Sequence, residues 1–157
     1  MAQQAEVKSF GQVDPVWQKV RQEAEKAVEA DKVIASLIYN AILNHQSLEE
    51  ALSYHLAQSL DYSDVDASVL NRTFSDIINN DEAFRQTLRI DMAAVFERDP
   101  ACNRLMEPLL YFKGFHALQT HRFAHRLWHR GSKDFAYYLQ SRSSKIFGVD
   151  IHPKAKI

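Results

Sequence analysis

A chain of 157 residues, 46% of them hydrophobic and 25% charged, is long enough for one globular domain with a buried core and is not composed like a disordered or fibrous protein. Its formal net charge of −1 gives no electrostatic basis for binding nucleic acid or an anionic membrane surface. Only 4 glycines are present, so few positions require a positive φ, and we expect a mostly helical interior.

The N-terminus, Met1 to Lys8, has no basic segment followed by an apolar run, so no secretory signal is expected. No apolar run approaches the roughly 20 residues that span a bilayer. The single cysteine, Cys102, cannot form an internal disulfide, which fits a reducing compartment, and we expect it to be a small, partly buried side chain. The expected location is cytoplasmic.

Helix-start signals divide the first hundred residues into five predicted helices. Asp14 places an N-cap acid before Pro15, and the apolar residues that follow recur on one face. Ser47 and Glu50 form a capping box. The predicted helices cover residues 14–31, 33–44, 47–60, 66–79 and 81–97.

The stretch Arg98-Asp99-Pro100-Ala101 interrupts this helical pattern. Pro100 disfavours helix at Asp99 and holds its carboxylate in an extended or turn conformation. Taken alone, Asp99 is more simply a turn residue that ends a helix than a functional group. Two further helices are predicted over residues 108–128, bent near Lys113-Gly114 and ending at Gly131, and over residues 134–147, ending at Gly148.

A histidine and an arginine recur together every fourth residue, as His121-Arg122, His125-Arg126 and His129-Arg130. Histidines at i and i+4 share a helix face and could bind a transition metal. The neighbouring arginines would repel a cation, however, and no second histidine-rich segment completes the ligand set. We therefore expect a solvated or interface-lining polar stripe and no metal site.

The last nine residues, from Val149 to Ile157, read differently from the helices before them. Ile151 and Ile157 are six residues apart, which is the spacing of a left-handed parallel β-helix. The predicted fold is thus an all-α, multi-helix N-terminal domain, residues 1–148, that leads into a hexapeptide-repeat β-helix. Residues 149–157 are expected to be its first strand, and the remainder of the β-helix is expected to be absent from this chain.

Local motifs make the chain resemble the bacterial and plant serine acetyltransferases over nearly its whole length from about Val16. The block Pro108 to Gln119, PLLYFKGFHALQ, is the most specific of them. The others are Ala51-Leu52-Ser53-Tyr54, Arg98-Asp99-Pro100-Ala101 and Phe147-Gly148-Val149-Asp150-Ile151-His152-Pro153.

This resemblance implies an acyltransferase of cysteine biosynthesis, which moves the acetyl group of acetyl-CoA to the hydroxyl of L-serine and makes O-acetylserine. It also implies that Asp150 is the carboxylate that orients the catalytic histidine and that this base lies on the next coil, beyond Ile157. Asp99 matches the position that helps to hold the substrate serine, with Pro100 shaping the turn. The acetyl-CoA groove belongs to the absent half, so this chain is expected to bind no cofactor and to be inactive alone.

His152 is the histidine nearest to Asp150 in the sequence, and two residues of one strand that are two apart share a face. A local Asp150-His152 pair is therefore conceivable, but in the family pattern this histidine belongs to the turn that leads into the β-helix. Ile157 is more simply a core aliphatic residue of the repeat than the terminal isoleucine by which the family docks in O-acetylserine sulfhydrylase. That docking tail is absent here.

Helical N-terminal domains of this family drive assembly into homo-oligomers, commonly hexamers built as a dimer of trimers. L-serine and acetyl-CoA are the expected small-molecule partners, and neither nucleic acid nor a membrane is expected. Two alternatives remain open: a non-catalytic helical oligomerisation module, and a hexapeptide-repeat acyltransferase with another acceptor.

Overall fold

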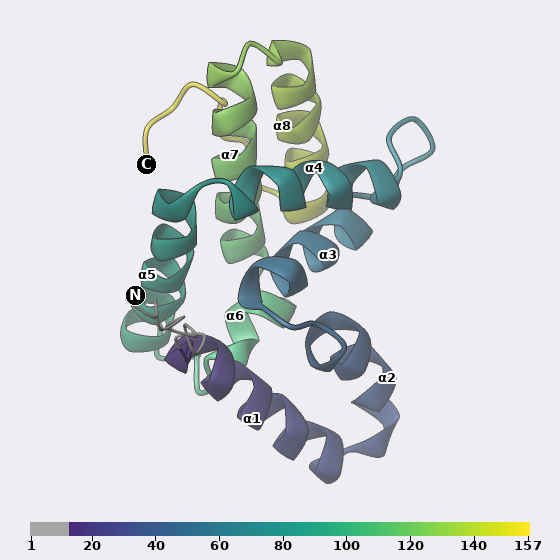
Figure 1. Cartoon of the computed structure of the whole chain (residues 1–157), viewed down its shortest axis with the longest axis vertical. Helices are drawn as coiled ribbons and strands as arrows, with labels where there is room; N and C mark the ends of the chain where they lie inside the picture. Colours follow the sequence, from purple (N-terminus) through teal and green to yellow (C-terminus); the bar gives the residue numbers. More distant parts are fainter. Residues whose placement is uncertain (1–12) are drawn as a thin grey trace, which may run out of the picture.

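The computed structural model describes residues 13–157 and is helical through most of that range (Figure 1). The expected absence of a secretory signal concerns residues 1–8, which lie outside the described range. The elements are α1 (Pro15–Ala30), η1 (Lys32–Ile34), α2 (Ala35–Ile38), η2 (Tyr39–Leu43), α3 (Leu48–Leu60), α4 (Ala67–Asn79), α5 (Glu82–Arg98), α6 (Met106–Tyr111), α7 (Lys113–His129) and α8 (Lys133–Phe147). No strand occurs among residues 13–157, which confirms the prediction of an all-α domain.

Two pairs of successive helices, α3 with α4 and α7 with α8, pack closely and cross one another. Figure 1 shows α7 and α8 side by side, with α3 and α4 crossing them and α5 descending from the end of α4. The helices α1 and α2 lie at the opposite end of the molecule from the α7–α8 loop (Figure 1). No helix in the part that the structure describes is long and apolar enough to cross a membrane.

The predicted helix starts at Asp14 and Ser47 are both confirmed. In the capping box at Ser47, one of the two hydrogen bonds is shifted by a residue. The Asp14 carboxylate accepts hydrogen bonds from the backbone N–H groups of Val16 and Trp17, at 3.1 and 3.3 Å. Ser47 Oγ accepts from the Glu50 N–H at 3.2 Å, as a capping box requires. The Glu50 carboxylate, however, accepts from the N–H of Gln46 at 2.7 Å, one residue before the cap.

The second predicted helix, residues 33–44, is less regular than its apolar pattern suggests. A single 3₁₀ turn, η1, is followed by the four-residue α2 and by the π-helical turn η2. Ile38, Ala41 and Ile42 are buried against the core. The apolar pattern of residues 33–44 therefore reflects which side chains are buried and does not require a regular α-helix.

The expectation of one bent helix over residues 108–128 is wrong. The chain breaks into α6 and α7 at Phe112, whose backbone is extended with φ −93° and ψ 103°. His116 repairs the break, because its Nε2 donates to the carbonyl of Leu109 at 2.8 Å and its N–H donates to the carbonyl of Phe112 at 3.0 Å. A carbonyl left free at the end of a helix is costly when buried, and this imidazole satisfies it.

The core is tied together by aromatic contacts between helices that are distant in sequence. The Phe123 ring of α7 stacks on Phe74 of α4, with centroids 4.4 Å apart, and meets Phe84 of α5 at 4.7 Å. All three side chains are fully buried. Replacing a buried Phe with Ala costs about 3–5 kcal/mol, so these rings fix α4, α5 and α7 together.

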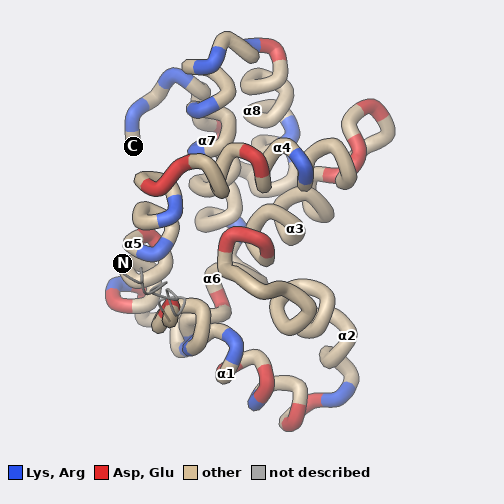
Figure 2. The backbone as a smooth tube through the Cα atoms, viewed as in Figure 1, with Lys and Arg blue, Asp and Glu red and all other residues tan. Residues whose placement is uncertain are grey.

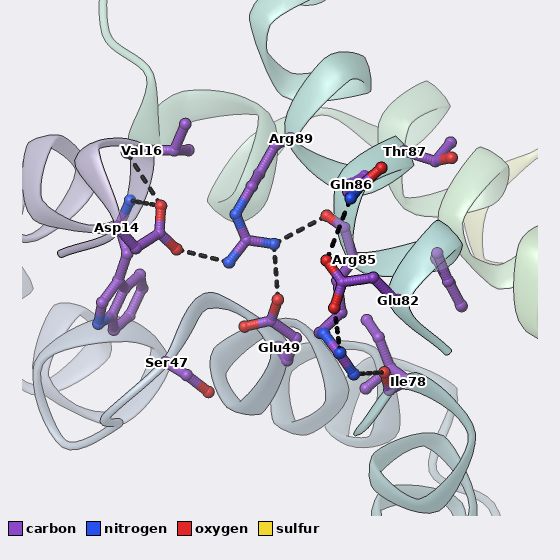
Figure 3. A network of polar contacts seen from close by, with 12 residues as sticks. Asp14, Val16, Ser47, Glu49, Ile78, Glu82, Arg85, Gln86, Thr87 and Arg89 are labelled. Carbon is purple, nitrogen blue, oxygen red and sulfur yellow. Dashed lines mark hydrogen bonds and ion pairs between the residues drawn. The ribbon is translucent and has the colours of Figure 1, made fainter. Parts of the chain in front are cut away.

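A polar network around Arg89 of α5 joins three helices on another side (Figure 3). Its guanidinium binds the carboxylates of Asp14, at the start of α1, and of Glu49, in α3. These two hydrogen-bonded carboxylates outweigh burial and raise the pKa of Arg89. The guanidinium is therefore a permanently charged link between α1, α3 and α5.

The chain leaves the last helix at Gly148, where the sequence predicts its end, and this glycine is left-handed with φ 77°. Residues 149–157 contain neither a helix nor a strand. A strand is recognised by its pairing with a neighbour, and within residues 13–157 no second extended segment lies beside this one. The division into domains 1–148 and 149–157 stays a prediction.

Candidate functional site

Asp99 lies at the turn that ends α5, as the sequence predicts. Its backbone is extended, with φ −92° and ψ 110°. Its Oδ1 accepts a hydrogen bond from the N–H of Ala101 at 2.9 Å, and its carbonyl accepts from the N–H of Cys102 at 3.0 Å. This turn presents the carboxylate on a fixed backbone, with Pro100 exposed beside it.

The Asp99 turn borders an open hollow of about 480 Å³. Its lining combines apolar and charged side chains and consists of Asp91, Ala94, Val95, Arg98, Asp99, Pro100 and Leu118. The Asp91 carboxylate is already engaged, because Arg122 binds both of its oxygens, at 2.7 and 2.9 Å, and Gln119 donates to it at 2.7 Å. Asp99 is thus the acid of this hollow with the fewest bonds to its carboxylate.

The sequence does not reveal that Asp91 lines this hollow or that it pairs with α7. Its signal is only its place on α5, eight residues before Asp99, and its partners Gln119 and Arg122 come from α7. A pair between helices that far apart in sequence leaves no local pattern.

Asp150 follows α8, near the end of the described residues, and is exposed. Its Oδ1 accepts a hydrogen bond from Gln140 Nε2 at 2.7 Å. The two residues border a hollow of about 450 Å³, which Tyr137, Ser141, Ser144 and Lys145 complete. One carboxylate oxygen is thereby anchored, and no described residue bonds the other.

The structure does not bring the predicted site residues together. Asp99 and Pro100 border one hollow and Asp150 borders another, and the two linings share no residue. Any reaction centre that uses both carboxylates therefore needs further parts.

His152 does not pair with Asp150 among the described contacts. Its Nδ1 accepts from the N–H of Lys154 at 3.0 Å, so the ring carries its proton on Nε2, which lies 3.4 Å from the Tyr137 hydroxyl. The ring also packs edge-on against Trp128, with centroids 5.2 Å apart. His152 is a turn residue held in an aromatic cluster, which agrees with the turn position that the family pattern gives it.

The His-Arg repeat of α7 divides into two faces with different partners. The arginines form ion pairs with acids of α4, α5 and the turn between them: Arg122 with Asp91, Arg126 with Asp81 at 2.9 Å, and Arg130 with Asp76 at 3.7 Å. Burial is the largest single effect and would raise the pKa of Asp81, but the hydrogen bonds from Arg126 and from the N–H of Phe84, together with the charges of Arg126 and Arg130, lower the pKa overall. Residues one apart on a helix point about 100° apart, so the histidines face elsewhere.

Two histidines of the repeat, His121 and His125, face the chain segment after α8. His125 Nδ1 lies 2.8 Å from the carbonyl oxygen of Pro153, and His121 Nε2 lies 3.1 Å from that of Ala155. No group of three or more potential metal ligands occurs among residues 13–157. His121 is only 6% exposed, so of the two expected alternatives, a solvated or an interface-lining stripe, the solvated one does not hold for this residue.

Three further titratable or nucleophilic side chains, those of His55, His116 and Cys102, line neither hollow. His55 and His116 lie with ring centroids 4.9 Å apart, and burial, together with the charge of His116, lowers the pKa of His55 to about 4. Burial also raises the pKa of the Cys102 thiol. None of these groups is set up as a base or nucleophile near Asp99 or Asp150.

Comparison with known proteins identifies relatives over nearly the whole described range. Residues 16–120 match the family model described as serine acetyltransferase, N-terminal. A probable serine acetyltransferase 2 of Oryza sativa is 42% identical over 144 residues, which cover 92% of this chain and 41% of that protein. The chain spans about half the length of the curated relatives that it matches.

Two solved structures are similar to the chain in fold and sequence. A serine acetyltransferase of Brucella abortus in complex with coenzyme A superposes with a TM-score of 0.90 at 50% identity, over 95% of this chain and 60% of that one. A serine acetyltransferase of Neisseria gonorrhoeae in complex with serine gives a TM-score of 0.85 at 41% identity, over 89% of this chain and 57% of that one.

Proposed function

The chain belongs to the serine acetyltransferase family, and we propose that the protein moves the acetyl group of acetyl-CoA to the hydroxyl of L-serine, giving O-acetylserine for cysteine biosynthesis. The observation that carries this proposal is the match of residues 16–120 to the family, together with the likeness to relatives whose structures contain coenzyme A or serine.

The reaction itself sets what the protein must supply. A base removes the proton of the serine hydroxyl while its oxygen bonds to the thioester carbon, and the C–S bond then breaks as the proton passes to the leaving CoA thiolate. The base is a histidine beyond Ile157. Asp150 orients that imidazole and stabilises its charged form. The free oxygen of Asp150, opposite the one that Gln140 binds, supports this role.

Asp99 is the second acid that the proposal uses, as a partner for the ammonium group of the substrate. The lightly engaged carboxylate on a fixed turn supports this assignment, because a charge-assisted hydrogen bond selects an amino acid over a neutral alcohol. Pro100 keeps the turn extended. The chain by itself would bind no cofactor, and acetyl-CoA is a co-substrate of the whole protein.

The helical domain is further proposed to drive assembly into a homo-oligomer, a dimer of trimers as in the family. The separation of Asp99 and Asp150 into two hollows supports a site that is completed by other chain segments or copies. O-acetylserine sulfhydrylase is the proposed protein partner, reached through a C-terminal tail beyond this chain.

A release assay with different acceptors tests the function. The full-length protein is incubated with acetyl-CoA and L-serine, free CoA thiol is titrated, and the product is identified by mass. Rapid release with L-serine and O-acetylserine as product is expected, whereas equal release with threonine or homoserine would favour the acyltransferase with another acceptor. No release with any acceptor would leave the oligomerisation module.

Asp99→Asn tests the contact with the substrate ammonium group. Removing the charge while keeping the size of the side chain is expected to raise the KM for L-serine about 10- to 100-fold, because a hydrogen bond to a charged group is worth about 1.5–3 kcal/mol. The KM for acetyl-CoA should change little. Glu97→Gln, an exposed acid two residues earlier, is the matched control. An unchanged KM for serine in Asp99→Asn contradicts the assignment.

A further inference from the structure

The segment after α8 turns back on itself and lies against α7. The N–H of Ala155 donates to the carbonyl of His152 at 2.9 Å, which closes a four-residue turn. The imidazole of His152 reinforces it by accepting from the N–H of Lys154 at 3.0 Å. Pro153, at the corner of the turn, is buried, so the turn packs on the protein.

Two imidazoles of α7 hold this turn by its backbone. A carbonyl oxygen only accepts hydrogen bonds, so His125 must donate through Nδ1 to Pro153, at 2.8 Å, and His121 through Nε2 to Ala155, at 3.1 Å. The two rings therefore carry their protons on different nitrogens. They are four residues apart on α7, one helical turn or about 6 Å along the axis.

The helix that carries these imidazoles is itself fixed on its other side. Arg122 binds both oxygens of Asp91 in α5, and Arg126 binds Asp81 just before α5. Phe123, between them, is buried in the core. The histidines thus project from a helix that cannot shift without breaking two ion pairs.

The held turn continues directly from the segment that carries Asp150. Only two residues separate Asp150 from Pro153, and Asp150 is bound on its other side by Gln140 of α8. Ile151, between the two anchors, borders a small apolar hollow formed with Ala117 and Leu139 of α7 and α8. The α7–α8 pair therefore contacts the segment at Asp150 and after it.

We propose that His121 and His125 are positioning residues: through the carbonyls of Ala155 and Pro153 they fix the 152–155 turn on α7 and so set where the Asp150 carboxylate is presented to its base. This role rests on the proposed function of Asp150. It gives a role to His121 and His125, which neither the chemistry of acetyl transfer nor metal binding requires.

Amide side chains give a crossed test, because Asn places an N–H donor where Nδ1 stood and Gln places one where Nε2 stood. His125→Asn and His121→Gln keep the required donor, whereas His125→Gln and His121→Asn place it wrongly. The first readout is the rate of tryptic cleavage after Lys154, an exposed lysine inside the turn. The second is the kcat for CoA release by the full-length protein.

The mismatched variants are expected to speed cleavage after Lys154 and to lower kcat about 10- to 100-fold with smaller changes in KM, because small misplacements of a catalytic group cost this much. The matched variants should stay near the wild type in both readouts. Faster cleavage with an unchanged kcat overturns the positioning role, and equal behaviour of Asn and Gln at each position overturns the hydrogen bonds.

Imidazole nitrogen NMR of the unsubstituted protein guards against variants that fail to fold. The Nδ1–H form for His125 and the Nε2–H form for His121 are expected, and the same form for both contradicts the proposal. Cleavage and tautomers report on the turn even if no acetyl transfer is found. A failure of the proposed function is therefore distinguished from a failure of this inference.

Discussion

At the scale of single residues, the carboxylates differ in how much of their bonding the described chain already uses. Asp91 and Asp81 are saturated by arginines and are structural. Asp150 has a single anchor from Gln140, and Asp99 a single bond from its own turn. The two acids that the proposed reaction uses are among those whose carboxylates the fold leaves largely available.

Replacing Asp150 with Asn tests its role as the orienting acid. An amide cannot stabilise the charged imidazole and can favour the wrong tautomer of the base, so kcat in the full-length protein should fall about 10²- to 10⁴-fold with little change in either KM. Steady-state CoA release measures this. Glu97→Gln serves again as an exposed acid-to-amide control, and a kcat within threefold of the wild type would remove Asp150 from the mechanism.

The buried pair His55 and His116 makes stability depend on pH. The pKa of His55 is lowered from 6.5 to about 4, chiefly by burial, and burial lowers that of His116 as well. Between pH 4 and pH 6.5 the unfolded chain therefore binds more protons than the folded chain. The stability that the neutral histidines contribute is fully present above pH 6.5 and is lost as the pH falls toward 4. His55 alone contributes a slope of up to about 1.4 kcal/mol per pH unit.

Urea unfolding between pH 7 and pH 4.5 measures this slope. His55→Gln should make the loss of stability on acidification smaller, while His129→Gln, an exposed histidine of α7, should leave it as in the wild type. If the stability of both variants falls with decreasing pH as steeply as that of the unsubstituted protein, the buried pair is not the cause of the pH dependence.

At the scale of elements, contacts between distant helices decide what local patterns leave open. Helix starts at Asp14 and Ser47, the extended turn at Asp99 and the helix ends at Gly131 and Gly148 follow from local chemistry and were predictable. The break at Phe112 was not, because its cost is met by the His116 side chain one turn further along. The anchoring of Asp150 by Gln140 likewise depends on how the chain turns after α8.

The start of α6 also depends on a distant helix, because no side chain of its own first turn caps it. Instead the buried Glu23 of α1 accepts a hydrogen bond from the N–H of Met106 at 2.9 Å. Glu23→Leu leaves this N–H unpaired and should lower the free energy of unfolding by about 1–3 kcal/mol. Glu23→Gln keeps an acceptor and should lose less.

Urea unfolding at neutral pH compares the two variants. Because a carboxylate also favours the positive end of a helix, the Gln variant should still fall somewhat below the unsubstituted protein. Equal stability of the Leu and Gln variants would show that the Glu23 cap does not hold α6.

At the scale of the whole molecule, charge is distributed without a dominant face. Figure 2 shows basic and acidic segments interspersed along the tube, in keeping with a net charge of −1. The family, and with it the fold, was recognisable from a few motifs. The relation of Asp99 to Asp150 was not, because residues 13–157 hold them in separate hollows.

The most direct test of the account compares CoA release from acetyl-CoA and L-serine by the full-length protein and by a chain that ends at Ile157. The account predicts release by the full-length protein and none by the shorter chain, which would have the proposed orienting acid Asp150 without its base. Release by the shorter chain at a comparable rate, or no release by the full-length protein, would contradict it.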